Sequence, residues 1–309
     1  MNPSNVPISR RRTLQLAGGV AVAGALGALP ATHSGNAMRL MSGSTQLFIP
    51  EPDPEWWETS SIWVVPGTDP NGKKGVPVAG QPAYVWAEIH NVSNVKVNDV
   101  QVRFYWANPA FEMLFSTINL IGTAHASIQP GSSQKVLCLV PWQVEFANKG
   151  HECLVVAASL PGDPPLPDLV DAPGYPQVAQ KNVTVWKVPP EEWDWSHIIL
   201  IATGDESRTI HVDSRIGGEL PPETLEQLGL REVSPVDGSV VDVRFSLRPG
   251  GGGEPRITVE VPAGATVPLY SNIRRTQPLP ANRYQHVIVS ATHDGQLIGG
   301  VSFVVMAQD

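Results

Sequence analysis

From residue 61 onwards, apolar and polar positions alternate along the chain. Val85, Ala87 and Ile89 alternate with polar or amphipathic residues, and the stretches 100–106 and 241–248 repeat this pattern. Because successive side chains of a strand point to opposite faces of a sheet, the alternation predicts strands that bury one face. Further strands are predicted at residues 61–65, 134–140, 151–159, 181–187, 257–261, 285–291 and 297–306, and one short helix at 222–229.

Pro189 and Pro190 divide these strands into two units. Paired prolines block a helix and donate no ladder hydrogen bonds, so residues 189–196 are expected to form an extended linker. The 28 glycines and 30 prolines fit many short strands joined by turns. The sequence therefore predicts an all-β fold with two immunoglobulin-like antiparallel β-sandwich domains in tandem. The expected segments are a signal peptide at 1–37, an extended arm at 38–60, a first sandwich at 61–188, the linker at 189–196 and a second sandwich at 197–309.

The N-terminus carries Arg10, Arg11 and Arg12, followed by a mildly apolar run over residues 17–29. This arrangement resembles the consensus of twin-arginine export signals, although Leu14 replaces the usual Phe. A membrane anchor would need a longer and more apolar stretch. The resemblance implies a bacterial protein that is periplasmic or secreted, with no membrane span in the mature part.

Several motifs within residues 60–188 follow one another in a familiar order. Residues 61–64 read Ser-Ile-Trp-Val, residues 105–109 read Tyr-Trp-Ala-Asn-Pro and residues 150–153 read Gly-His-Glu-Cys, with further matching stretches at 77–82, 85–91 and 178–183. This region resembles the cell-adhesion-related domain found in bacteria. The resemblance implies an immunoglobulin-like sandwich. Because the motifs are strand and turn positions, it supports function only weakly.

Two cysteines, Cys138 and Cys153, lie on neighbouring predicted strands. If both faced the core between two sheets about 10 Å apart, they could form a disulfide after export. The alternative is two buried thiols that act as small hydrophobic side chains. We expect the disulfide.

All nine tryptophans precede residue 196. Four of them lie in the predicted arm and linker, where exposed rings could stack on sugars or anchor a partner: Trp56, Trp57, Trp193 and Trp195. In the alternative interpretation these four pack the arm and the linker onto the domains. The remaining five would then fill the core of the first sandwich: Trp63, Trp86, Trp106, Trp142 and Trp186.

The sequence contains no motif of catalysis or cofactor binding that we can identify. It lacks a G-x-S-x-G nucleophile turn, a phosphate-binding glycine loop and a zinc-protease motif. No catalytic, cofactor-binding or metal-binding residue is therefore predicted. Loss of the three signal arginines would take the net charge from −8 to −11, which disfavours a nucleic-acid partner.

The function predicted from these features is that of an exported, non-catalytic binding or adhesion-type protein. Its partner would be an envelope or extracellular protein or a polysaccharide. One alternative is a carbohydrate-binding or hydrolytic accessory module that uses exposed tryptophans and acidic residues. Another is an accessory subunit of an enzyme exported by the twin-arginine route.

Overall fold

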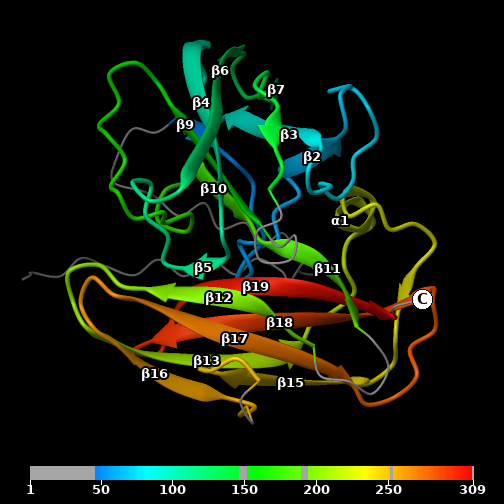
Figure 1. Cartoon of the computed structure of the whole chain (residues 1–309). Helices are drawn as coiled ribbons and strands as arrows, with labels where there is room; N and C mark the ends of the chain where they lie inside the picture. The colour runs from blue at the N-terminus through cyan, green and yellow to red at the C-terminus, as the bar shows by residue number, and fades with distance from the viewer. Residues whose placement is uncertain (1–45, 146–151, 189–193, 251–252, 308–309) are drawn as a thin grey trace, which may run out of the picture. The chain divides into compact units, whose positions relative to one another are not determined.

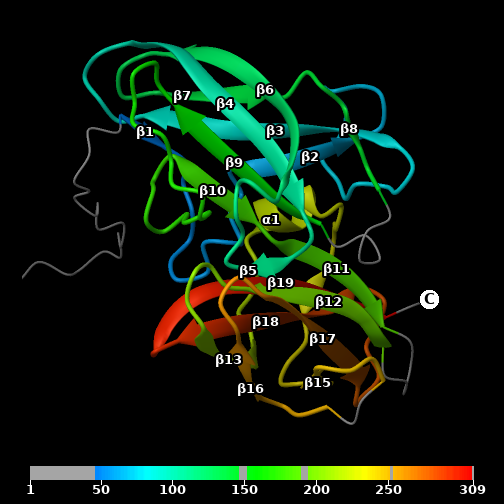
Figure 2. The same ribbon diagram turned by 60° about the vertical axis from the view of Figure 1, so that its left-hand side comes forward.

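The computed structural model describes residues 46–145, 152–188, 194–250 and 253–307. The first sandwich consists of two antiparallel sheets (Figures 1 and 2). Sheet A is built around β3 (Pro82–Asn91), which pairs on one side with β1 (Leu47–Phe48) and β2 (Ile62–Pro66) and on the other with β7 (Ser133–Leu137) and β8 (Trp142–Gln143). Sheet B has the order β10 (Val178–Lys181), β9 (Cys153–Ser159), β4 (Val97–Ala107) and β6 (Asn119–Ile128).

The second sandwich also has two sheets, labelled C and D here. Sheet C has the order β15 (Val241–Ser246), β17 (Thr266–Arg275), β12 (Asp194–Ala202) and β5 (Ala110–Phe111). Sheet D has the order β11 (Val183–Val188), β19 (Gln296–Ala307), β18 (Arg283–His293), β13 (Arg208–Ile216) and β16 (Ile257–Val261), and β14 (Ser234–Pro235) pairs with β18. The helix α1 spans Pro222–Gln227.

Each sandwich has its own apolar core, built from the inward-facing residues of alternating strands. Val85 and Ile89 of sheet A meet Val102 and Phe104 of sheet B in one buried cluster. A second cluster fills the space between sheets C and D, with Ile199, Phe245, Leu269, Val289 and Phe303 among its members. The predicted all-β sandwich fold is confirmed.

Asn182 marks the point where the chain leaves the first sandwich and enters the second. The sequence predicted one strand over residues 181–187 as part of the first sandwich. Instead, β10 pairs with β9 in sheet B, whereas β11 pairs in parallel with β19 in sheet D. Asn182 is fully buried; its N–H donates to the Trp57 carbonyl, and its carbonyl accepts from Ser302 N. The last strand assigned to the first sandwich therefore belongs to the second.

Two further segments differ from the predicted boundaries. Residues 194–196 belong to β12 and not to a linker, while residues 189–193 lie outside the described part of the chain. The short β5 follows β4 of the first sandwich but pairs in parallel with β12 in sheet C. Residues 44–309 accordingly form one compact unit. Local alternation could not show these exchanges, because it identifies a strand without identifying its neighbour.

The predicted disulfide between Cys138 and Cys153 is wrong, since both are free, buried thiols. Cys138 lies in the core between sheets A and B, together with Leu154 and Val156 of β9. Cys153 precedes Leu154 by one residue, so its side chain points to the opposite face of sheet B, where it packs with Val155 and Met113. Burial raises the pKa of both thiols.

We expect two free thiols per chain, neither of which reacts in the folded protein. Burial and the raised pKa of each thiol keep the reactive thiolate scarce and inaccessible. Titration with a chromogenic thiol reagent should give no fast reaction in buffer and two equivalents in denaturant without reductant. Fewer than two equivalents in denaturant would contradict the free-thiol state.

Candidate functional site

A groove of about 460 Å³ lies between β6 and β7, where sheets A and B each end at one side of the first sandwich. The two strands lie side by side in both Figure 1 and Figure 2. Residues 123–127 of β6, residues 134–137 of β7 and the neighbouring Leu139 line it. The two strands do not pair with each other: β6 pairs only with β4 and β7 only with β3 in the described part of the chain.

The side chains of β6 explain why the groove opens where it does. At Gly122 the strand approaches the segment after β7 so closely that an added Cβ would lie 2.8 Å from Cys138 Sγ and 2.9 Å from Val140 Cβ. Further along, Ala124 and Ala126 face the core but pack against it only in part, and β6 becomes fully buried again only at Ile128. Small side chains at the rim of a sandwich leave space between its two sheets.

An exposed aliphatic patch borders the closed end of this groove. Leu139 is 75% exposed, Leu120 55% and Val140 49%. The close approach of Gly122 to Val140 brings the start of β6 beside residues 138–140, so the three side chains belong to one region of the surface. We call Leu120, Leu139, Val140 and the groove together the edge groove. Exposed apolar clusters of this kind are typical of interaction sites.

β6 is itself unusual as an edge strand. At ten residues it is the longest strand that ends a sheet in the described part of the chain; β7 and β16 have five residues, β11 and β15 six and β10 four. Proteins usually protect such edges with charged residues or proline. β6 contains no lysine, arginine, aspartate, glutamate or proline. Its free backbone groups are therefore available to another strand.

The ionisable groups of the groove are basic. Lys135 and His125 are the two ionisable residues among those that line it, and no carboxylate lines it. His125 Nδ1 lies 2.6 Å from the exposed Asp99 carboxylate. Lys135 Nζ lies 5.8 Å from the centre of the Trp63 ring, and Lys135 is in register with Glu88 on β3.

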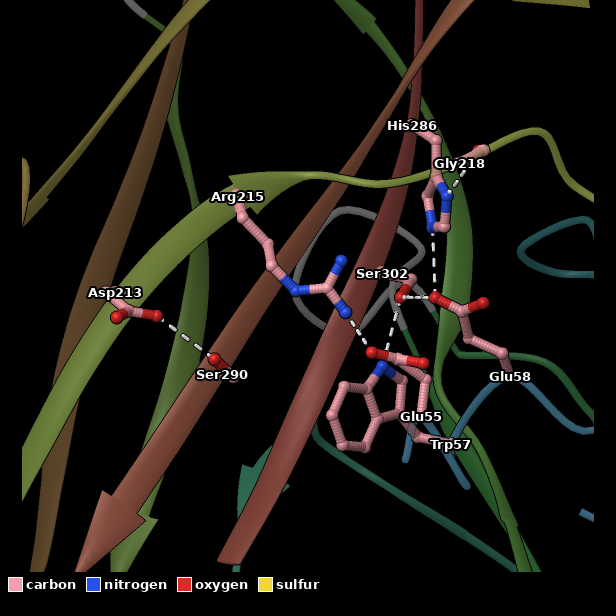
Figure 3. Close-up of polar contacts among 9 residues, drawn as sticks. All are labelled: Glu55, Trp57, Glu58, Asp213, Arg215, Gly218, His286, Ser290 and Ser302. Atoms are coloured by element: carbon pink, nitrogen blue, oxygen red, sulfur yellow. Dashed lines mark hydrogen bonds and ion pairs between the residues drawn. The ribbon is translucent and has the colours of Figure 1, made fainter. Parts of the chain in front are cut away.

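A second candidate is a buried chain of hydrogen bonds that the sequence did not predict (Figure 3). Trp57 Nε1 donates to Ser302 Oγ over 3.0 Å, and Ser302 Oγ donates to Glu58 Oε1. Glu58 Oε1 also lies 2.9 Å from His286 Nε2, and His286 Nδ1 lies 3.1 Å from the Gly218 carbonyl oxygen. Both imidazole nitrogens lie within hydrogen-bond distance of an oxygen, so the His286 ring is held on both sides.

The buried hydrogen-bond network contains Ser, Glu and His, but its hydrogen bonds run in the wrong order for nucleophilic catalysis. A catalytic serine gives its proton to histidine, whereas Ser302 donates to the carboxylate. Ser302 is also fully buried, and a Cβ on the adjacent Gly300 would lie 2.1 Å from the Trp57 ring, so no space exists for a substrate. The cluster fastens residues 55–58 to β18 and β19. On the surface beside it, Arg215 pairs with Glu55.

The third candidate is a polar cluster around Lys181, between the first sandwich and α1. Its ammonium donates to the Thr59 carbonyl, to the Ile62 carbonyl over 2.9 Å and to Gln227 Oε1. Gln227 in turn donates to the Ser60 carbonyl. Burial, and then the charge of Lys74, lower the pKa of Lys181 to about 7. Three donors matched to three acceptors indicate a structural role.

Of the four predicted ligand-contact tryptophans, the structure describes the side chains of Trp56 and Trp57. Trp57 is 1% exposed, and Trp56 packs beside it with ring centres 5.0 Å apart. Trp193 and the side chain of Trp195 lie outside the described part, as do Arg10, Arg11 and Arg12 of the predicted signal.

The tryptophans expected in the core of the first sandwich lie in different places. Trp142 is buried in the core between sheets A and B. Trp63 and Trp86 stack on each other beside Lys74 instead, on the outer face of sheet A. The described residues hold no cluster of three or more potential metal ligands. They include no helix long and apolar enough to cross a membrane.

The edge groove was missed because β6 has a weak sequence signal. A register shift between Phe104 and Tyr105 of β4 interrupts the strict alternation along β6, and its inward positions before Ile128 are glycine and alanine. The available signal was an uncharged, proline-free run over residues 118–129 that ends at Pro130 and Gly131. Such a run is compatible with a strand but does not show that the strand lies at an edge.

The buried chain of hydrogen bonds makes Trp57 important for stability. Replacement of Trp57 by Phe removes the Nε1 donor to Ser302 inside the protein, and we expect the free energy of unfolding to fall by about 2 kcal/mol. The control is Trp86→Phe. The Nε1 of Trp86 donates to the Pro70 carbonyl at a half-buried position, where water can replace the lost hydrogen bond. Urea denaturation measures both; equal losses would contradict the buried network.

Lys181 predicts a pH-dependent stability that disappears with the side chain. An unfolded lysine keeps its proton up to about pH 10.4, whereas Lys181 in the folded protein loses it near pH 7. Between these values the unfolded state binds more protons, so the unfolding free energy rises with pH by up to about 1.4 kcal/mol per unit. The unfolding free energy of the wild type, measured relative to that of Lys181→Met in urea titrations, should therefore rise from pH 7 to pH 10. Lys96→Met, at an exposed position, controls for loss of a charge. Parallel curves for wild type and Lys181→Met would contradict the prediction.

Comparisons with known proteins identify no family. No protein-family model matches the chain, and no curated protein matches it. The resemblance of residues 60–188 to the cell-adhesion-related domain therefore stays a prediction.

Solved structures include distant likenesses. The crystal structure of the CupB6 tip adhesin from Pseudomonas aeruginosa aligns with a TM-score of 0.26 and 10% identity, over 85% of this chain and 96% of that one. Red sea bream transglutaminase aligns with a TM-score of 0.22 and 10% identity, over 81% of this chain and 32% of that one. Likenesses at this level carry no argument about function, which must come from the surface itself.

Proposed function

We propose that the chain is a non-catalytic binding protein that engages a partner protein through the edge groove. The observation that carries the proposal is the long, uncharged edge strand β6 beside the exposed Leu120, Leu139 and Val140. An apolar patch next to free backbone groups offers a partner both hydrophobic contact and directed hydrogen bonds. With the predicted export signal, the partner would belong to the cell envelope or the extracellular space.

The exposed side chains favour a protein partner over a polysaccharide. Sugar recognition by stacking needs an exposed aromatic ring. The large hydrophobic residues that are exposed in the described part of the chain are all valine, leucine or isoleucine. Trp57, which the sequence placed in a carbohydrate-binding alternative, is buried instead.

The buried polar clusters do not favour a hydrolytic accessory module. Ser302 has no access to a substrate, and its hydrogen-bond order does not activate it. An accessory subunit of an exported enzyme remains compatible with the proposal, because such an enzyme would itself be a protein partner at the edge groove.

A photo-reactive amino acid placed at position 139 tests this function. Introduced into the full chain in the producing cells, it should cross-link one envelope or secreted protein, identified by mass spectrometry. The matched control is position 247, where Leu247 is 44% exposed on the second sandwich. Equal cross-linking at both positions, or none at 139, would overturn the proposal.

Charge substitutions give the second readout. Leu120→Lys should lower the cross-linking yield at position 139 by about tenfold, because it puts a charge into an apolar contact. Ile216→Lys, also exposed and outside the edge groove, should leave the yield unchanged. Both substitutions should change the free energy of unfolding by less than about 0.5 kcal/mol.

A further inference from the structure

We infer that the partner binds by adding an extended strand to the free edge of β6, with apolar side chains inserted between sheets A and B. This inference rests on the proposed function and specifies its mode and the chemistry of the occupant. The occupant is an extended segment of the partner protein in which apolar and polar residues alternate and at least one residue is acidic.

The backbone of β6 provides the first argument. Its ten residues pair with β4 on one side, and no described strand pairs with the other side. Residues 123–127, which border the groove beyond the close approach at Gly122, extend over about 17 Å, which is the length of an average strand. An added strand lies only about 4.8 Å from its neighbour, whereas a helix with its side chains is about 10–12 Å across, so the free edge of β6 suits one strand and not a helix.

The side chains in the groove provide the second argument. Ala124 and Ala126 face the core from β6, and Val136 faces it from β7. All three border the groove; Val136 is buried, whereas Ala124 and Ala126 are partly exposed and offer apolar surface on this side. Alternate side chains of an added strand would point inward onto them, while the intervening side chains would point to solvent. This parity is what requires an alternating occupant.

Charge provides the third argument and decides between a partner segment and a second copy of the chain. The chain carries a net charge of −8, yet the groove is lined by Lys135 and His125 and by no acid. A second copy would bring two strongly acidic chains together. An acidic segment instead gains attraction from Lys135, which is in register with Glu88 of β3, whereas His125 already lies against the Asp99 carboxylate.

Peptide selection on the full chain tests the inference. A displayed library of random nine-residue peptides is selected against the wild-type protein, with Leu139→Lys as counter-selection. The selected peptides should alternate apolar and polar residues and carry an acid. Affinity is then measured by fluorescence anisotropy for synthetic copies in which each backbone N–H is methylated in turn.

Strand addition gives a two-residue periodicity in this scan. Methylation of alternate N–H groups should weaken binding by about tenfold or more, and methylation of the intervening groups by less than about twofold, because only every second N–H faces β6. The amides of β6 should gain protection from hydrogen exchange when the peptide binds, whereas the amides of edge strand β16 should not.

Two pairs of variants separate this mode from a simple apolar contact. Ala126→Leu fills the groove and should weaken peptide binding by about tenfold, while the same change at Ala263→Leu, exposed in a turn of the second sandwich and outside the groove, should not. Lys135→Glu should weaken binding about threefold or more, and Lys96→Glu, exposed and outside the groove, less. Urea denaturation of each variant shows whether its fold is retained.

Each other outcome overturns the inference. These outcomes are a library without binders, a methylation scan without periodicity, selected peptides that are helical, or protection of β6 in a homodimer without peptide. If position 139 cross-links a partner but the scan lacks periodicity, strand addition fails and the proposed function stands. If position 139 cross-links nothing while peptides bind with the expected periodicity, the groove accepts a strand but the proposed function fails.

Discussion

The structure depends on the burial of Asn182 and of the backbone on either side of it. A buried peptide group must find hydrogen-bond partners, and Asn182 finds them on two elements: its N–H donates to the Trp57 carbonyl and its carbonyl accepts from Ser302 of β19. Its side chain adds a bond to the Gly300 carbonyl. The residues before it belong to sheet B and those after it to sheet D. One residue thus ties the two sandwiches to residues 55–59, so the three elements depend on one another.

This constraint explains why polar groups collect in a region that an unconstrained core would leave apolar. Once residues 55–59 are fastened against β10 and β19, Glu58 is enclosed, and burying a carboxylate is costly unless it is paired. His286 and Ser302 supply that pairing. Lys181, next to Asn182, is satisfied in the same way by two carbonyls and Gln227. These residues resemble catalytic or binding groups in type, but their geometry and burial serve cohesion.

At the edge groove, by contrast, no described element covers the free backbone groups of β6 or the exposed aliphatic side chains beside it. β10, at the other edge of sheet B, is short and leads directly into sheet D. β6 is long, uncharged and bordered by exposed leucines. The edge of sheet B that holds the molecule together is therefore closed, and the edge that faces away from that junction is open. This asymmetry separates the structural part of the first sandwich from the part available for recognition.

The sequence by itself determined the fold class and most strands of the sandwich cores, because period-two alternation is a local property that follows from the geometry of a strand. It identified β3, β4, β15 and β16 by this pattern. It also identified Cys138 and Cys153 as buried, since their neighbours are apolar.

Only the tertiary structure decided which elements meet, because pairing depends on residues distant in the chain. Alternation showed that Cys153 and Leu154 face opposite ways but not which of them faces Cys138. It placed residues 183–188 in a strand but could not choose between sheets B and D. Trp57 looked like part of an exposed arm, and only contact with Ser302, 245 residues away, buries it. The open edge of β6 was equally hidden, because an edge is defined by a missing neighbour, and no local pattern records what a strand lacks.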